Sequence, residues 1–316
     1  MPGVPPARYA YLGPAGTFTE QALRALPAAR GAHCEPHIGV AAALESVRAG
    51  EADGAVVPLE NSVEGSVSVT LDELATGVPL VITREVEVPV ELALLARPGR
   101  DLYTVRTVAT HPHAAAQCRL WLGRHLPDVE VVPLGSTAQA AQLVAGPDAI
   151  YDAAIAAPIA AEHYRLAVLA SRIGDNPDAI TRFVLVSRPG ALPRRTGADK
   201  TTVVAYIRDD HPGALMEVLD QFALRGVNLT RIESRPTGLG LGRYCFSIDC
   251  EGHVVESRVG EALMGLRRVC SDVRFLGSYP RLDQQQTVVR LGTGDDDFAD
   301  AKGWLARLRA GDPSSA

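Results

Sequence analysis

Three things are scarce in this sequence: cysteines, long apolar runs and an excess of positive charge. The cysteines number five, are scattered and include no Cys-x-x-Cys pair, which argues against a disulfide framework or a zinc site and favours a reducing compartment. No apolar run reaches transmembrane length, and residues 1–6 lack the basic and apolar regions of a signal peptide. We therefore expect a soluble, cytoplasmic protein.

The charge balance narrows the class of partner. The chain has 37 acidic and 31 basic residues, a net charge of −6, and no run of like charge longer than the triplet 295–297. This argues against nucleic acid or an anionic membrane surface as the main partner. If the substrate is an anion, the positive field that holds it must be local and must come from helix N-termini and a few arginines.

The first 188 residues alternate between predicted strands and helices. Thr17 with Glu20, and Ser136 with Gln139, are capping boxes that predict helix starts, and Asn61 with Glu64, or Ser62 alone, can cap a further helix. This order predicts a mostly parallel α/β sheet with polar strand-to-helix turns along one edge. The expected strands are 9–12, 54–59, 105–109, 129–134 and 152–156, and the expected helices include 17–26, 114–125 and 158–164.

Residues 79–169 read as a lobe inserted into a first lobe made of residues 8–78 and 170–188. Two lobes joined by crossovers leave a cleft, which is the usual place for a ligand. We therefore predict a two-lobed catalytic domain over residues 1–188. The stretch 189–199, rich in Pro, Gly and Arg, reads as a linker.

After the linker the pattern changes to βαββαβ over residues 200–280, a ferredoxin-like split unit. Its expected strands are 201–207, 227–235, 244–250 and 273–277, and its expected helices are 212–224 and 254–269. One face of this sheet would stay bare unless the domain dimerises or packs elsewhere. The tail, 281–316, contains a possible helix near 297–308 whose apolar residues could dock on the body: Phe298, Trp304, Leu305 and Leu308.

The stretch 175–186 changes from an Asn-Pro turn into an apolar, β-branched run that predicts a buried strand. Thr181 and Arg182 lie where the turn becomes the strand. A hydroxyl proton donor beside a guanidinium would suit a small anionic substrate that loses an oxygen. Taken alone, the pattern favours the simpler interpretation, in which Thr181 is an ordinary β-former and Arg182 an ordinary solvated charge.

Together these motifs resemble the prephenate dehydratase family over nearly the whole chain up to Tyr279. The resemblance is carried by 11–18 (YLGPAGTF), 58–65 (PLENSVEG), His111-Pro112 with Gln117-Cys118, and Thr181-Arg182-Phe183. It implies conversion of prephenate to phenylpyruvate, water and carbon dioxide, a catalytic fold like that of type II periplasmic-binding proteins, and no metal or organic cofactor. The fused chorismate mutase domain of some relatives is expected to be absent.

The resemblance also implies roles for single residues. Thr181 is the candidate proton donor, and Asn61 and Gln117 are expected to hydrogen-bond the substrate. Arg182 either pairs with a substrate carboxylate or braces the cleft from behind. Further substrate-binding candidates, for which simple helix capping is an alternative, are Ser62, Thr110, Ser136 and Thr137. Where many relatives have Ser and Gln, this chain has Thr110 and His113. His111 and His113 suggest a metal, but no third ligand has suitable spacing.

In the small domain, residues 213–215 and 233–236 resemble the phenylalanine-sensing motifs of an ACT domain. The resemblance implies that phenylalanine binds between paired ACT domains, in a homodimer or homotetramer, and inhibits the distant site. The expected effector-binding residues are Gly213, Ala214, Leu215, Asn228, Glu233, Ser234, Arg235 and Pro236, although Glu233 and Arg235 could equally be exposed strand charges. The alternatives for the whole chain are an arogenate dehydratase and a non-catalytic amino-acid-binding protein.

Overall fold

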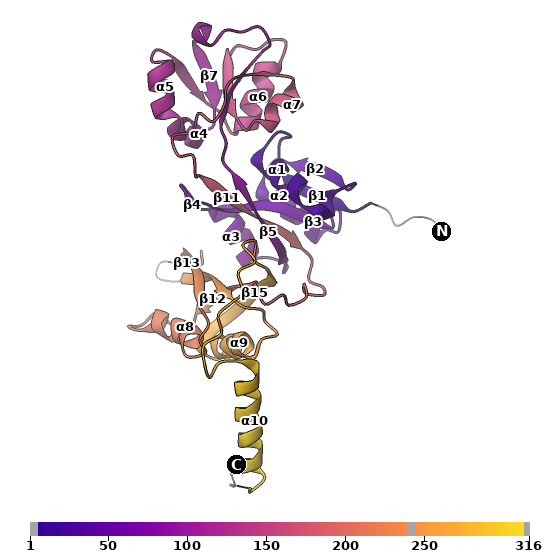
Figure 1. The fold of residues 1–316 in the computed structure, drawn as a ribbon, viewed down its shortest axis with the longest axis vertical. Coiled ribbons are helices and arrows are strands. Elements are labelled where there is room, and N and C mark those ends of the chain that lie inside the picture. The colour runs from indigo at the N-terminus through magenta and orange to yellow at the C-terminus, as the bar shows by residue number, and fades with distance from the viewer. Residues whose placement is uncertain (1–5, 239, 241–243, 313–316) are drawn as a thin grey trace, which may run out of the picture. The chain divides into compact units, whose positions relative to one another are not determined.

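The computed structural model describes residues 6–238, 240 and 244–312 (Figure 1). The chain forms two compact units. The first is built from the chain up to Glu73 together with Val86–Arg188, and the second from Leu74–Glu85 together with the chain from Pro189 onward. The chain therefore crosses from the first unit into the second and back again before it reaches the linker.

One sheet of the first unit carries the strand with Thr181. Its order is β2-β1-β3-β11-β5, and β4 pairs with β3. The strands β1, β2 and β3 are parallel, whereas β11 runs antiparallel to β3. The elements of this part are β1 (Arg8–Leu12), α1 (Phe18–Ala25), η1 (Pro27–Ala29), β2 (His33–His37), α2 (Val40–Arg48), β3 (Gly54–Asn61), β4 (Gly65–Ser66), α3 (Ser68–Ala75), β5 (Val81–Pro89) and β11 (Ile180–Ser187).

A second sheet of the same unit has the order β10-β6-β9-β7-β8, in which β7 runs parallel to both β8 and β9. Both faces of this sheet are buried under apolar clusters made mostly of Ala, Val, Leu and Ile, so the helices beside it pack closely. Its elements are β6 (Ala93–Ala96), η2 (Leu102–Thr104), β7 (Thr107–Thr110), α4 (Pro112–Gln117), α5 (Arg119–His125), β8 (Glu130–Pro133), α6 (Thr137–Ala145), β9 (Ala153–Ala156), α7 (Ile159–Tyr164) and β10 (Ala167–Ala170).

Two predicted helices differ from the structure. The helix expected directly after Asn61 is absent, because the Asn61 side chain closes a turn and the chain continues as β4 before α3 begins at Ser68. The helix expected over residues 114–125 is two helices separated at Cys118. The capped starts of α1 at Thr17 and α6 at Ser136 are confirmed.

The second unit has the predicted βαββαβ order, with a four-stranded sheet in the order β13-β14-β12-β15. Both helices cover one face of this sheet, where Phe222 and Leu266 pack against Val203 and Ile248. Segment Leu74–Glu85 belongs to the same unit. The elements are β12 (Asp199–Ile207), α8 (Ala214–Ala223), β13 (Leu229–Pro236), β14 (Tyr244–Glu251), α9 (Ser257–Val269) and β15 (Cys270–Pro280).

The tail contains α10 (Asp295–Arg309). The expectation that its apolar residues dock on the body is wrong for Trp304, Leu305 and Leu308, since Trp304 is 45 % exposed and the other two are exposed as well. The tail is attached instead through polar groups at the start of α10. No helix in the described parts of the chain has the length and apolar character needed to span a membrane.

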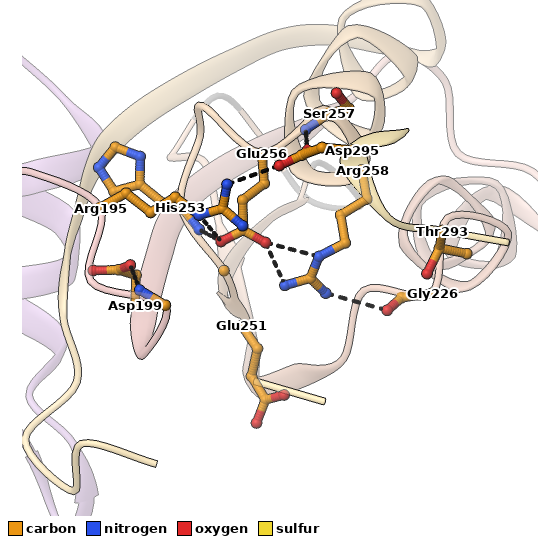
Figure 2. Close-up of polar contacts among 12 residues, drawn as sticks. Arg195, Asp199, Gly226, Glu251, His253, Glu256, Ser257, Arg258, Thr293 and Asp295 are labelled. Atoms are coloured by element: carbon orange, nitrogen blue, oxygen red, sulfur yellow. Dashed lines mark hydrogen bonds and ion pairs between the residues drawn. The ribbon is translucent and has the colours of Figure 1, made fainter. Parts of the chain in front are cut away.

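Figure 2 shows those polar groups, which lie around the start of α9. Glu256 and Arg258 form a buried ion pair with two hydrogen bonds, from Nε and Nη2 of the guanidinium, at 2.9 and 2.8 Å. Asp295 accepts from the Ser257 backbone N–H and from Arg195 of the linker, both at 2.7 Å. Linker, helix start and tail are thus joined within the second unit.

Candidate active site

The first unit contains a cavity of ≈ 980 Å³ with walls from both of its sheets, at the upper end of the range typical of small-molecule sites. Thr181 and Phe183 of β11 and Asn61 of β3 form part of the wall, and Gln117, Ser136 and Thr137 come from the other sheet's loops and helices. The cleft between lobes predicted from the sequence is present.

Thr181 and Asn61 are opposite each other in the antiparallel pair β11–β3. Asn61 Nδ2 donates to Thr181 Oγ at 2.8 Å. The amide orientation is fixed from the other end, because Asn61 Oδ1 accepts from the backbone N–H groups of Val63 at 2.8 Å and Glu64 at 3.0 Å. Since Thr181 Oγ accepts from Asn61, the hydroxyl proton of Thr181 can be directed to a different acceptor.

Arg182 lies outside the cavity lining. Successive residues of a strand point to opposite faces, so Arg182 points away from the wall formed by Thr181 and Phe183. Its side chain is buried, and Nη1 is 3.7 Å from a carboxylate oxygen of Glu60. Of the two roles expected for Arg182, this position favours bracing of the strand from behind.

Gln117 lies on the wall close to two other polar residues. Its Nε2 is 3.4 Å from Oε1 of Glu64, whose other carboxylate oxygen is 3.7 Å from Nδ1 of His113. The neighbouring His111 caps α4, because its Nδ1 accepts from the His113 N–H. Burial lowers the pKa of His111, and the charge of His113 lowers it further against the opposing effect of Glu64. The imidazole therefore favours the neutral form that the cap requires.

The groups on the cavity wall that can attract an anion include the starts of two helices. Among the described residues that line the cavity there is no lysine or arginine. The starts of α1 and α6 lie on the wall through Thr17, Thr19, Ser136 and Thr137, and the first-turn N–H groups of a helix attract anions. Because Ser136 Oγ already accepts from the Gln139 N–H at 3.0 Å, its hydroxyl serves as the helix cap.

Besides Arg182, two further residues expected to contact the substrate are not on the cavity lining. Thr110 is fully buried in β7, and its hydroxyl donates to the Ile155 carbonyl at 2.7 Å. Ser62 Oγ accepts from the Ile180 N–H at 3.0 Å. Since these hydroxyls are held by the backbone, Thr110 is better explained as a link between strands and Ser62 as a support for the start of β11.

Two carboxylates hold the loops beside the cavity. Glu20 accepts from the Gly16 N–H at 2.7 Å and pairs with His163 of α7 at 2.9 Å, which ties the 13–17 turn to the other lobe. Asp175 accepts from Leu120 N at 2.9 Å and from Trp121 N at 3.2 Å, so it caps α5 from the loop that precedes Thr181. In the described parts of the chain, no group of three potential ligands could hold a metal ion.

Comparison with known proteins identifies the family. The prephenate dehydratase model matches residues 9–191, and the ACT domain model matches residues 201–268. A prephenate dehydratase of Amycolatopsis methanolica is 48 % identical over 97 % of this chain and 99 % of its own length. The chain belongs to the prephenate dehydratase family. Like the other members of that family, it is a hydro-lyase, and its catalytic part has the expected periplasmic-binding-like fold.

Solved structures agree with this assignment. The crystal structure of an Arthrobacter aurescens prephenate dehydratase in complex with L-Phe is 57 % identical, with a TM-score of 0.93 over 96 % of this chain and 100 % of that chain. A structure described as a novel type of quorum quenching acylase is 31 % identical, with a TM-score of 0.77 over 88 % of this chain and 100 % of that one. The family fold is therefore also found in a protein named for another reaction.

The residues expected from the sequence to bind an effector lie in the second unit. Gly213 is the N-cap of α8 with φ +98°, Ala214 is buried behind it, and Leu215 is 39 % exposed. Ser234 and Pro236 lie in β13 with Glu233 and Arg235, whose charged groups are 4.0 Å apart. Asn228 precedes β13, and its carbonyl accepts from the Glu251 N–H. These residues thus form two separate groups within the unit, one at the start of α8 and one along β13.

Sequence reasoning missed part of the cavity. Glu64 was treated only as a capping partner of Asn61, whereas the structure places it on the wall. The motif 58–65 already indicated a polar wall, since Asn61 and Glu64, three residues apart, follow a predicted buried strand. His37, Ser66, Ser68 and Gln142 also line the cavity, and nothing local in the sequence marks them.

Proposed function

We propose that this chain converts prephenate to phenylpyruvate, water and carbon dioxide, with Thr181 as the hydrogen-bond donor to the departing hydroxyl. The observation that carries the proposal is the Asn61–Thr181 hydrogen bond on the wall of the cavity, inside the region that the family model matches. In this bond Asn61 donates and the Thr181 oxygen accepts. The threonine proton is therefore not used in the bond and can point into the cavity.

The protein needs to do little more than hold the substrate in position and donate hydrogen bonds to it. Prephenate carries two carboxylates and a ring hydroxyl opposite the ring carboxylate, and losing carbon dioxide and the hydroxyl together makes the ring aromatic. The net reaction takes up one proton to release water, and solvent supplies it. Because a threonine hydroxyl is a weak acid, its hydrogen bond strengthens as the C–O bond breaks, without early full transfer; general-acid help is typically worth about 10²–10⁴-fold.

The substrate carboxylates are held by neutral donors in this account. The first-turn N–H groups of α1 and α6 and the Gln117 amide lie on the cavity wall. Fixed donors in a site closed to water stabilise charge more strongly than they would in bulk solvent. Arg182 contributes indirectly, by holding the strand behind Thr181 against Glu60.

We further propose that phenylalanine inhibits the enzyme through the second unit, that ACT domains pair into a dimer or tetramer, and that the enzyme works in the cytoplasm. The relative bound to L-Phe and the ACT match support the first two statements. The biosynthetic role of the family supports the third. Size-exclusion chromatography with light scattering would report the oligomer.

One observation favours a second substrate. The Glu64 carboxylate on the cavity wall would attract the ammonium group that arogenate carries in place of the prephenate keto group. The change Glu64→Gln should lower kcat/KM for arogenate more than for prephenate. An equal effect on both would remove Glu64 from substrate choice.

The direct test is phenylpyruvate formation from purified protein and prephenate, with and without phenylalanine. Turnover that phenylalanine suppresses supports both halves of the proposal. Turnover without suppression supports the catalytic half and contradicts the regulatory one. Consumption of arogenate alone changes the substrate but leaves the mechanism. If neither compound reacts, the chain is a binding protein.

A further inference from the structure

Segment Leu74–Glu85 is far from the ACT domain in sequence but belongs to the second unit. At its beginning, the Ala75 carbonyl accepts from the Tyr206 hydroxyl and from Arg274 Nη1, the latter at 3.0 Å. Arg274 Nη2 donates to the Gly77 carbonyl at 2.7 Å. Tyr206 lies in β12 and Arg274 in β15, so two neighbouring strands of the regulatory sheet hold the same turn.

The end of the segment, at Glu85, also bonds to residues of the second unit. Glu85 and Lys200 of β12 form an ion pair at 2.8 Å, in which the Glu85 side chain is 3 % exposed. The other Glu85 oxygen accepts from the Leu282 N–H at 3.1 Å. Between these points Ile82 is fully buried, and its backbone lies so close to Gly277 that any Cβ there would collide with the Ile82 carbonyl. The regulatory sheet and this segment are therefore closely packed.

On its N-terminal side, the segment continues from α3, which leads back to the cavity. Ser68, the first residue of α3, lines the cavity together with Ser66 and Val67. Val67 N donates to the Leu59 carbonyl of β3 at 2.9 Å, two residues before Asn61. The helix is eight residues long and so spans about 12 Å. Its last residue, Ala75, is the one that Tyr206 and Arg274 contact.

On its C-terminal side, the segment continues along β5, which also leads to the cavity. Val90, directly after β5, lines the cavity, and its N–H donates to the Ala179 carbonyl at 2.7 Å. Ala179 is two residues before Thr181. The two flanks of the segment thus meet the two strands that carry Asn61 and Thr181.

We propose that segment Leu74–Glu85 couples the regulatory sheet to the active site, and that Tyr206 and Arg274 are positioning residues which act through it. A shift of β12 or β15 on effector binding moves the end of helix α3 and the start of strand β5. Both of these elements lead to the cavity wall. The inhibition by phenylalanine in this inference rests on the proposed function. The coupling itself is a property of the chain and is testable without any ligand.

The variants are Tyr206→Phe and Arg274→Met, singly and together, which remove the bonds to Ala75 and Gly77. Both keep the bulk of the side chain and leave the sheet and the cavity residues unchanged. The matched control is Arg267→Met, because Arg267 is an exposed arginine of the same unit that pairs with Asp272. Circular dichroism and thermal melting confirm that each variant is folded.

The first measurement is inhibition of prephenate turnover, read as kcat and KM with and without saturating phenylalanine, beside the Kd for phenylalanine. Allosteric couplings are typically 5–150-fold. We expect the double variant to keep its turnover without phenylalanine and its Kd, while the factor by which phenylalanine lowers kcat/KM falls at least about fivefold. Arg267→Met should keep the wild-type factor. An unchanged factor in the double variant overturns the inference.

The second measurement is amide hydrogen exchange of the ligand-free proteins. Loosening the bonds to Ala75 and Gly77 should speed exchange at residues 66–68 and 88–92 in the double variant and not in Arg267→Met. Equal exchange there in both variants overturns the coupling. If wild-type protein proves insensitive to phenylalanine, the regulatory part of the proposed function fails, and the exchange result still decides whether the segment connects the sheet to the cavity.

Discussion

Asn61 and Thr181 are separated by 120 residues in sequence, yet Asn61 Nδ2 donates to Thr181 Oγ at 2.8 Å. The same asparagine accepts two backbone N–H groups through its other amide atom. Its orientation is therefore fixed by the fold, and Thr181 receives a donor on one side only. This relationship leaves the Thr181 hydroxyl proton free to point toward a different acceptor, as the proposed catalytic role requires.

The change Asn61→Asp should remove that freedom. A carboxylate can still accept from Val63 and Glu64, but its second oxygen can only accept, so it takes the Thr181 proton as its own hydrogen bond. We expect kcat to fall about 10²–10⁴-fold, and little further loss when Thr181→Val is added, because the two residues act as one unit. The measurement is steady-state turnover of prephenate.

The control for this change is Asn176→Asp. Asn176 closes a similar turn, with its Oδ1 accepting from the Asp178 N–H at 3.0 Å, and it lies outside the cavity lining. It should keep kcat. If Asn61→Asp behaved like Asn176→Asp, the hydrogen bond to Thr181 would have no catalytic role.

Protonation of His111 should cause part of the decline of kcat/KM at acid pH. Burial and the charge of His113 lower its pKa, and the neutral ring caps α4. A lowered pKa means that the cap is fully present above the unfolded value of about 6.5 and is lost as the pH falls through the folded value. We therefore expect kcat/KM to decline on the acid side, and His111→Asn, which keeps an acceptor at the cap but does not titrate, to reduce that decline.

The pH profile is measured between about pH 5 and pH 8 for wild type, His111→Asn and His125→Gln. His125 is an exposed residue of α5, outside the cavity lining, and its replacement should leave the profile as it was. An acid limb that is identical in all three proteins would show that His111 does not govern it.

The buried pair Glu256–Arg258 (Figure 2) should make a large contribution to stability when only one partner is removed. Arg258 is 2 % exposed, so Arg258→Met leaves a buried carboxylate without its main partner, and such losses cost about 3–5 kcal/mol. Adding Glu256→Gln should restore part of the urea midpoint. Arg267→Met, at an exposed pair, should cost less than about 1 kcal/mol. A double variant no more stable than Arg258→Met would contradict this explanation.

Asp295 should make the attachment of the tail sensitive to acid. The Ser257 N–H lowers the pKa of this carboxyl, and Arg195 lowers it further, against the effect of burial. A lowered folded pKa gives stability that is present above the unfolded value of about 3.9 and lost as the pH falls through the folded value. Asp295→Asn should therefore lower the urea midpoint at neutral pH, and the difference from wild type should shrink toward strong acid.

The control for this pH series is Asp296→Asn, at an exposed position next to Asp295. It should follow the wild-type midpoint throughout. A constant difference between Asp295→Asn and wild type at every pH would mean that the carboxylate charge is not what holds the start of α10.

Local signals in the sequence predicted much of this structure. Thr17 and Ser136 do accept the N–H three residues on, as their capping patterns require. The βαββαβ order of the second unit follows from periodicity in the same way, because each element has its own apolar face. Thr181, Asn61 and Gln117 were found through motifs, and all three line one cavity.

The remaining features depend on partners far away in the chain. The sequence predicted that Asn61 binds the substrate or caps a helix. It did not predict the antiparallel register of β3 with β11, which directs the Asn61 amide donor to Thr181. The break at Cys118 arises because Asp175, 55 residues from Leu120, caps α5. For Arg182 the sequence left two roles open, substrate ligand or brace, and the strand alternation, with Glu60 nearby, favours the second. Only the folded chain determines which of two plausible partners a polar group finds.

The central claim is that the Thr181 hydroxyl assists departure of the substrate hydroxyl, and one comparison tests it most directly. Prephenate turnover is measured for wild type, Thr181→Val and Thr181→Ser, together with phenylalanine binding as a check on the fold. We predict that Thr181→Val loses at least about 10²-fold in kcat, that Thr181→Ser retains most of the activity, and that all three bind phenylalanine alike. Near-normal turnover by Thr181→Val would contradict the account.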